Sequence, residues 1–157
     1  MNELLLARYT VETLLYRYAL VLDSGPLEHW PRCFTEEGRY RLVPRENHAR
    51  GLPVALMLCT SRAMMEDRVT AIQKASVFTP HTIRHLYTNV LVDEVQAGRA
   101  LARANYAVYR SVEGGETDLL SVGSLEARVQ LEPAPLFESM EVIYETCRIP
   151  GLVVYPL

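Results

Sequence analysis

The chain has 157 residues, of which 49% are hydrophobic and 22% are charged, and its formal net charge is −3. This length and composition are typical of a globular chain with a substantial core, so a single domain is expected over residues 1–157. The negative charge argues against a protein that binds nucleic acid or an anionic membrane through a basic surface.

Cysteine spacing and the N-terminal sequence indicate the compartment. Cys33, Cys59 and Cys147 are far apart and odd in number, which is typical of reduced thiols rather than of a disulfide framework. The N-terminus lacks the basic region of a secretion signal, and no stretch approaches the roughly eighteen uncharged apolar residues of a membrane helix. A cytoplasmic protein without a membrane segment is therefore expected.

A long helix is predicted at the N-terminus. Apolar residues recur every three or four positions from Leu4 to Leu22, which is the spacing of one buried stripe. Ser24-Gly25-Pro26 is predicted to end this helix, because glycine suits a left-handed cap and proline cannot continue the hydrogen-bond ladder.

Shorter elements are expected between this helix and Pro80. In chain order, the pattern predicts a short helix over 27–34, a strand over 38–43, a polar loop over 44–51, an apolar run over 53–59 that fits either a strand or a buried helix, and a helix over 61–75. Within the first of these, Trp30, Pro31 and Phe34 are predicted to pack together in the core.

The second half of the chain is rich in β-forming residues. Strands are predicted over 82–95, 100–110, 118–131 and 136–146, joined at 96–98 and 113–116 by hairpin turns. Gly123 predicts a bulge or a sharp bend in the third of these strands. Helices followed by a long antiparallel meander predict an α+β fold, in which the sheet curls over the first helix and encloses a cone-shaped interior.

The sequence offers no pattern for a metal or a cofactor. Among the histidines, only His81 and His85 are spaced four apart, and in a strand they would lie about 13 Å apart, too far for one ion. The Cys/His pairs of an iron–sulfur site and the glycine-rich nucleotide and nucleophile motifs are absent. No metal or cofactor site is therefore predicted in this chain.

Polar residues on otherwise apolar elements are the remaining candidates for a site. Asp23 lies at the end of the first helix, and His85 and Asn89 are predicted to share one face of a strand, with Arg84 on the opposite face. In a cone-shaped domain, Asp23 and His85 would suit an acid–base pair lining a pocket. The favoured alternative is that Asp23 caps or pairs locally, that His85 is a satisfied core or interface histidine, and that Arg84 is structural.

The C-terminal segment is unusually apolar. Residues 149–157 would expose much hydrophobic surface if they were free in solvent. Burial against the domain's own sheet or against another subunit would remove this surface from water, and the second outcome is favoured.

Several stretches, taken together and in this order, carry a family resemblance. They are Leu22–Ser24, Glu28–Phe34, Tyr40–Leu42, Met64–Val69, Thr82–Val90 and Arg103–Arg110. Over nearly the full chain they resemble the small (beta) subunits of Rieske-type aromatic-ring-hydroxylating oxygenases. Pro44–Asn47, Gly51–Pro53 and Tyr155–Leu157 most resemble the small subunits of salicylate 5-hydroxylases, with terephthalate and anthranilate oxygenases as neighbouring groups.

This resemblance implies a cystatin-like cone, similar to nuclear transport factor 2 (NTF2), and a structural subunit for an enzyme of salicylate- or benzoate-type substrates. It also implies an α3β3 hexamer on a trimer of small subunits. The Rieske [2Fe–2S] cluster and the mononuclear non-heme iron would belong to the large subunit, with NAD(P)H electrons arriving through a reductase. No catalytic residue is carried over. Structural or interface roles are assigned to Asp67, Arg84, His85, Asn89 and Tyr155.

Two other classes of protein are compatible with the same cone. Stand-alone enzymes such as scytalone dehydratase and ketosteroid isomerase use it for acid–base chemistry, and Asp23 and His85 would then be the catalytic pair of a dehydratase or isomerase. A protein that encloses a small ligand without chemistry is the third class. Fold alone does not choose among them.

Overall fold

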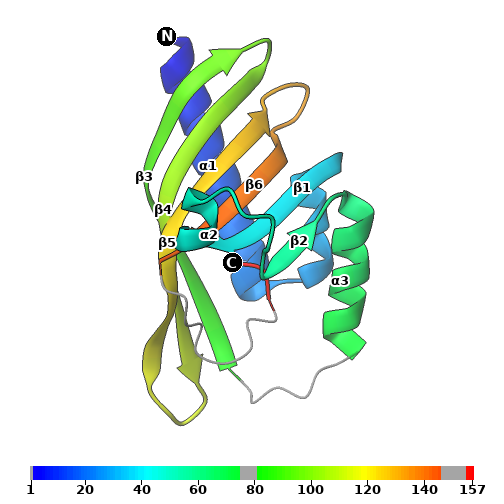
Figure 1. Cartoon of the computed structure of the whole chain (residues 1–157), viewed down its shortest axis with the longest axis vertical. Coiled ribbons are helices and arrows are strands. Elements are labelled where there is room, and N and C mark those ends of the chain that lie inside the picture. The colour runs from blue at the N-terminus through cyan, green and yellow to red at the C-terminus, as the bar shows by residue number, and fades with distance from the viewer. Residues whose placement is uncertain (1, 75–80, 146–154) are drawn as a thin grey trace.

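A curved six-stranded sheet wraps one long helix in the computed structural model (Figure 1), which describes residues 2–74, 81–145 and 155–157. The sheet has the strand order β2-β1-β6-β5-β4-β3. The elements run in the order α1 (Glu3–Ser24), the 3-10 turns η1 (Leu27–His29) and η2 (Pro31–Cys33), β1 (Phe34–Pro44), α2 (Arg45–Ala49), β2 (Met57–Cys59), α3 (Arg62–Lys74), β3 (His81–Gln96), β4 (Arg99–Val112), β5 (Thr117–Gln130) and β6 (Leu136–Tyr144).

Helix α1 ends where its sequence predicts, and its start is capped by a side chain that the sequence interpretation did not single out. The Asn2 side chain accepts a hydrogen bond from the Leu4 N–H at 3.1 Å and caps the first turn. Gly25, at φ 64°, ends the helix and donates its N–H to the Val21 carbonyl. The buried stripe, which packs mainly against β3, consists of Ala7, Val11, Leu14, Leu15, Tyr18, Ala19 and Leu22. No helix among the described residues is long and apolar enough to cross a membrane.

The sheet is mixed rather than wholly antiparallel. Strands β3 to β6 form the predicted antiparallel meander, but β1 pairs with β6 in parallel, from Arg39 opposite Ser139 to Pro44 opposite Tyr144. The chain leaves β1, crosses to the far edge of the sheet at β3, and returns strand by strand, so that β6 arrives beside β1 in the same direction. Parallel neighbours need such a long crossover. The sequence predicts the antiparallel meander but not this parallel pairing of β1.

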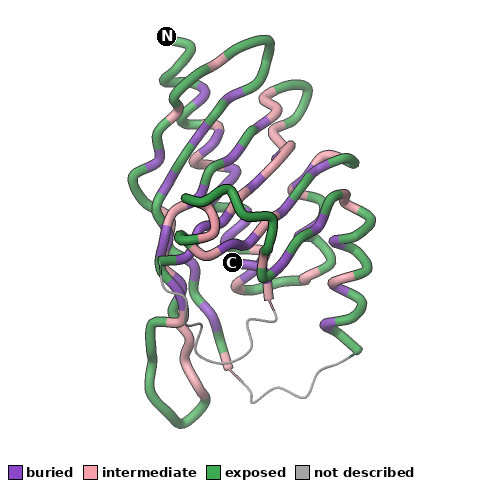
Figure 2. The backbone as a smooth tube through the Cα atoms, viewed as in Figure 1, coloured by how far each residue is buried: buried purple, intermediate pink, exposed green. Residues whose placement is uncertain are grey.

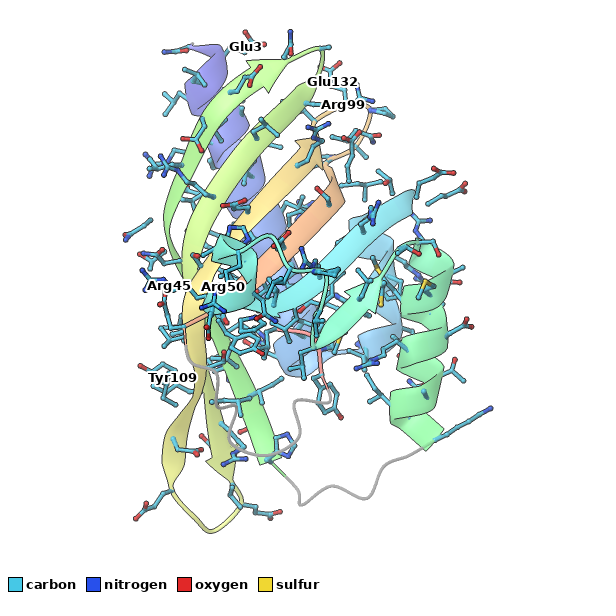
Figure 3. The ribbon with its side chains drawn as sticks, viewed as in Figure 1. Glu3, Arg45, Arg50, Arg99, Tyr109 and Glu132 are labelled. Atoms are coloured by element: carbon cyan, nitrogen blue, oxygen red, sulfur yellow. The ribbon has the colours of Figure 1, made fainter. Side chains whose placement is uncertain are left out.

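Two short elements, α2 and β2, lie between β1 and α3. The 44–51 region was predicted as a loop, but it contains α2. Two side-chain contacts hold α2 on the sheet: Arg45 lies 2.8 Å from Glu145, and His48 lies 2.7 Å from Glu141. Arg45 is labelled in Figure 3. These partners lie far along the chain, so local sequence does not reveal them. The ambiguous 53–59 run resolves as β2, an edge strand antiparallel to β1.

Gly123 is required for a close approach of two strands, not for a bulge. It sits in regular register between Tyr106 and Tyr144, and a Cβ atom there would lie 1.9 Å from the Ile143 carbonyl oxygen. The irregularity in β5 falls nearby instead, where Leu120 is left unpaired beside the Val108 register shift. Of the two predicted alternatives at Gly123, the bulge was wrong in position by a few residues, the sharp bend stays a prediction, and the glycine itself has a steric reason.

Inward-facing side chains fill the cone, and buried positions alternate along the strands (Figure 2). Trp30, Phe34 and Tyr40 pack edge to face with ring centroids 5.4–6.3 Å apart. The predicted placement of Trp30, Pro31 and Phe34 in the core is confirmed, because all three residues are buried, and Tyr40 joins them.

The end of the chain enters this core. The Leu157 N–H donates to the Tyr40 hydroxyl at 2.9 Å, and the Leu157 carbonyl oxygen accepts from Tyr18 at 3.1 Å and Tyr40 at 3.2 Å. Pro156 and Leu157 are buried in their own domain, contrary to the favoured expectation of burial against another subunit. The rest of the apolar tail, 149–154, lies outside the described residues.

Candidate functional site

Asp23 and His85 form a hydrogen-bonded pair that joins α1 to β3. The Asp23 Oδ1 atom lies 2.6 Å from the His85 Nδ1 atom, and both carboxylate oxygens accept from the His85 backbone N–H at 3.0 Å. Asp23 reaches this position because it lies in the last turn of α1, next to the buried Leu22 in the sequence. The acid–base alternative required these two residues, 62 positions apart, to meet, and they do; Asp23 does not pair locally, as the favoured alternative expected.

The pair is sealed from solvent. The side chain of His85 is 0% exposed and that of Asp23 is 3% exposed. Because a carboxylate only accepts hydrogen bonds, Nδ1 carries the imidazole proton, and Nε2 presents a lone pair when the ring is neutral. Among the described residues, neither the His85 Nε2 nor the hydroxyl of the adjacent Tyr87 has a hydrogen-bond partner. Tyr87 stacks on His85 with ring centroids 6.3 Å apart.

Tyrosine hydroxyls surround the same interior. The Tyr18 hydroxyl accepts from the Trp30 indole N–H at 3.2 Å and, as described above, donates to Leu157. On the opposite wall, Tyr106 and Ser121 share a hydrogen bond of 2.9 Å. Burial raises the pKa of Tyr18 and Tyr87 well above the ordinary value, so these groups are neutral hydroxyls at physiological pH.

The arrangement suits a structural tie better than catalysis. An acid–base pair must come within hydrogen-bond reach of a substrate, and both of these side chains are inaccessible. A surface groove is present elsewhere in the structure. That groove lies on the outer face of the sheet, between Arg39 and Arg103, and neither member of the pair lines it. Breaking the pair would leave a charge or a donor buried without a partner.

The other predicted residues do not join this site. Asn89 adopts φ 55° at a register shift in β3, which turns it to solvent and puts Val90 on the inner face. The prediction that Asn89 shares a face with His85 was therefore wrong. Arg84 lies on the opposite face and is exposed, as predicted. Asp67 is exposed on α3, and Tyr155 is half-buried with its ring 6.3 Å from that of His81.

Tyr87 and Leu157 are the members of the interior that the sequence interpretation missed. Tyr87 was recognisable, because it follows His85 by two residues on the same face of a strand. Leu157 was not, because nothing local fixes where the tail turns inward. Within the described ranges, no group of three or more His, Cys, Asp and Glu side chains is placed to hold a metal ion.

The buried tyrosines predict a loss of stability in alkali. Burial raises the pKa of Tyr106 to about 12 and that of Tyr40 further. Unfolded tyrosines ionise near pH 10, so the stabilisation from these neutral hydroxyls is complete below about pH 10 and is lost as the pH rises toward about 12. We expect the urea midpoint to fall between about pH 10 and pH 12. Complete tyrosinate absorbance near pH 10 in the folded chain would contradict this expectation.

Comparison with known proteins identifies the class of this domain. A family model described as a SnoaL-like domain matches residues 3–135, and the chain belongs to that family. An NTF2-like protein with a cystatin-like fold from Novosphingobium aromaticivorans superposes with a TM-score of 0.69 at 20% identity, covering 92% of this chain and 86% of that one. The cone-shaped α+β fold is thereby confirmed.

Two more similar proteins narrow the assignment. The anthranilate 1,2-dioxygenase small subunit of Burkholderia cepacia is 33% identical over 150 residues, covering 95% of this chain and 93% of that protein. A structure from Novosphingobium aromaticivorans, assigned as the beta subunit of an aromatic-ring-hydroxylating dioxygenase, has a TM-score of 0.88 and 33% identity, covering 97% of both chains. The chain belongs to the family of small subunits of aromatic-ring dioxygenases.

Proposed function

We propose that this chain is the non-catalytic small subunit of a multicomponent aromatic-ring-hydroxylating oxygenase that takes a salicylate- or benzoate-type substrate in aromatic degradation. The observation that carries this proposal is the 33% identity to the anthranilate 1,2-dioxygenase small subunit, which spans 95% of the chain. The substrate of that relative is an aromatic carboxylate, which supports the proposed substrate class.

The redox chemistry is assigned to a partner. In this proposal a large subunit holds a Rieske [2Fe–2S] cluster and a mononuclear non-heme iron, and NAD(P)H supplies electrons through a reductase. The sequence lacks the Cys/His pairs that a Rieske cluster needs, so the residues of this chain do not fit that group. The chain's own contribution is a rigid cone within a proposed cytoplasmic α3β3 hexamer, whose base is a trimer of small subunits.

The residues that match the family motifs receive structural roles. His85 fastens β3 to α1 through Asp23 inside the cone. Arg84, Asn89 and Asp67 are exposed and are available for contacts with other subunits. Tyr155 packs against His81 where the described part of the chain resumes.

A stand-alone dehydratase or isomerase is the second candidate, because Asp23 and His85 lie 2.6 Å apart. That activity needs a substrate to reach the pair, whose side chains are buried. Such an enzyme would act alone and would lose activity, but not assembly, on substitution of His85 by alanine. The small-subunit proposal expects the reverse, with no activity to lose and weaker folding or assembly.

Co-purification tests the proposal directly. A tagged copy of this chain, expressed with the large subunit of an aromatic-ring-hydroxylating oxygenase from the same genome, should retain that subunit through size-exclusion chromatography. Iron and acid-labile sulfide should be present in the complex and absent from the chain purified by itself. Failure of the two chains to associate, or stoichiometric iron in the chain alone, would contradict the proposal.

A further inference from the structure

A charged groove crosses the outer face of the sheet. It has a volume of about 680 Å³ and takes lining residues from all six strands. Its residues alternate with inward-facing core residues, as Arg39 and Arg41 do with Tyr40 and Leu42. The groove is therefore separate from the buried Asp23–His85 pair and opens on the face away from α1.

One row of charges in the groove is internally neutralised. Arg41, Glu141, Glu126 and Arg103 occupy directly paired positions on β1, β6, β5 and β4. Arg41 lies 3.4 Å from Glu141, and Arg103 lies 3.0 Å from Asp93 on the neighbouring strand. His48 of α2 lies 3.7 Å from Glu126 as well as against Glu141. The acidic side chains of the groove thus face cationic or hydrogen-bonding groups of this chain.

The next row has two arginines without a counter-ion. Arg39 on β1 and Arg128 on β5 both pair in register with Ser139 on β6, so their Cα atoms stand roughly 10 Å apart across one strand. Both are exposed, and neither has a carboxylate within ion-pair distance in the part of the chain described. Two guanidinium groups that flank a serine hydroxyl are suited to bind carboxylates in a forked geometry.

Partly exposed leucines lie beside arginines of the groove, Leu101 opposite Arg128 and Leu58 opposite Arg41. Leu58 on β2 and Leu101 on β4 line the groove and are 45% and 37% exposed. A fitting occupant therefore presents carboxylates on a slim segment of polypeptide that also covers apolar side chains. A highly hydrated free anion would leave both leucines in water.

The chain itself carries a segment of that chemistry. The turn between β4 and β5 contains Glu113-Gly114-Gly115-Glu116 and projects away from the body of the molecule (yellow, Figure 1). Both glutamates are exposed. The two glycines between them carry no side chain, and a Cβ at Gly114 would meet nothing within 4 Å. Two carboxylates on a narrow tip complement two unpaired arginines in a groove.

We infer that this acidic turn of one copy binds in the Arg39–Arg128 groove of a second copy. Because the two surfaces differ, each copy offers one turn and one groove, and repetition of the contact closes into a ring when the rotation permits. The inference deepens the proposed function by naming the contact that builds the ring of small subunits. It concerns contacts between copies of this chain, so it is tested without the large subunit.

Sedimentation velocity over a concentration series of the isolated chain tests the contact. We expect the wild type and a control, Arg17→Gln with Arg32→Gln, to associate equally, because those arginines are exposed and lie outside the groove lining. Arg39→Gln with Arg128→Gln, and separately Glu113→Gln with Glu116→Gln, should each weaken association at least about tenfold, since close charge pairs at interfaces contribute strongly. Circular dichroism should show all variants folded.

Mixing the two variants gives a sharper result. Groove-deficient copies keep the turn and turn-deficient copies keep the groove, so an equal mixture should form heterodimers through one intact contact but no closed ring. A wild-type chain that stays monomeric, or a groove variant with wild-type association, would overturn the inference. A groove variant that still self-associates but no longer binds the large subunit would also overturn the inference, because the groove would then bind that partner. Failure of the wild type to bind the large subunit would instead count against the proposed function.

Discussion

Replacing Asp23 with alanine will lower the free energy of unfolding by about 3–5 kcal/mol, because it removes one partner of a buried polar pair. The carboxylate accepts three hydrogen bonds from His85, two from its backbone N–H and one from its ring. Without it, the ring Nδ1 joins Nε2 as a second buried group without a partner. Urea unfolding monitored by far-UV circular dichroism at neutral pH measures the loss.

Asp93 provides the matched control for this experiment. Like Asp23, it is an aspartate that contacts another polar side chain, here that of Arg103, but its own side chain is 48% exposed. Replacement of Asp93 with alanine should cost no more than about 1 kcal/mol, as is usual for exposed ion pairs. Equal losses in the free energy of unfolding for the two variants would show that burial does not make the Asp23–His85 pair more stabilising than an exposed ion pair.

Replacing Gly123 with alanine will have an effect of similar or greater size. The new methyl carbon would lie 1.9 Å from the Ile143 carbonyl oxygen and 3.0 Å from the Tyr144 Cα, both of which are backbone atoms. A flexible side chain cannot relieve this contact, so β5 and β6 must move apart. We expect a loss of at least about 3 kcal/mol, at the upper end of overpacking effects, together with a low soluble yield.

Ser124→Ala is the control for Gly123→Ala, because it changes the next residue of the same strand without adding atoms against β6. Its urea midpoint should stay close to that of the wild type. A Gly123→Ala variant that is as stable as Ser124→Ala would mean that the two strands are farther apart than the structure shows.

The sequence predicts those features that depend on local periodicity. The apolar stripe of α1, its end at Gly25 and the long meander follow from spacing and turn chemistry, and the structure has them. The sequence offered the meeting of Asp23 with His85 only as the less favoured alternative, although a buried polar residue has to find a partner inside. Charge and burial preferences show that such a residue needs a partner, but they do not say which one.

Features set by distant parts of the chain were not predictable in this way. The parallel pairing of β1 with β6 depends on where the meander returns, which no local pattern records. Asn89 leaves the face of His85 because one residue with positive φ shifts the strand alternation. The apolar character of the tail predicts that it is buried, but the partners Tyr18 and Tyr40 of Leu157 lie more than a hundred residues away in the sequence.

The burial of the Asp23–His85 pair bears on function as well as on stability. In a cone that can host acid–base chemistry, this pair is enclosed, and Leu157 occupies part of the interior beside Tyr18 and Tyr40. Asp23 and His85, the candidates for acid–base chemistry, therefore stabilise the fold of the domain. This interpretation agrees with a supporting role in an oxygenase whose turnover takes place in another chain.

Ring hydroxylation by purified components is the most direct test of that role. The isolated chain, the large subunit alone and the two together are each supplied with reductase, NAD(P)H and salicylate, benzoate or anthranilate, and the hydroxylated product is quantified. We expect no product from this chain alone and turnover only when the large subunit is present. Conversion of an aromatic substrate by this chain without the large subunit would contradict the proposed function.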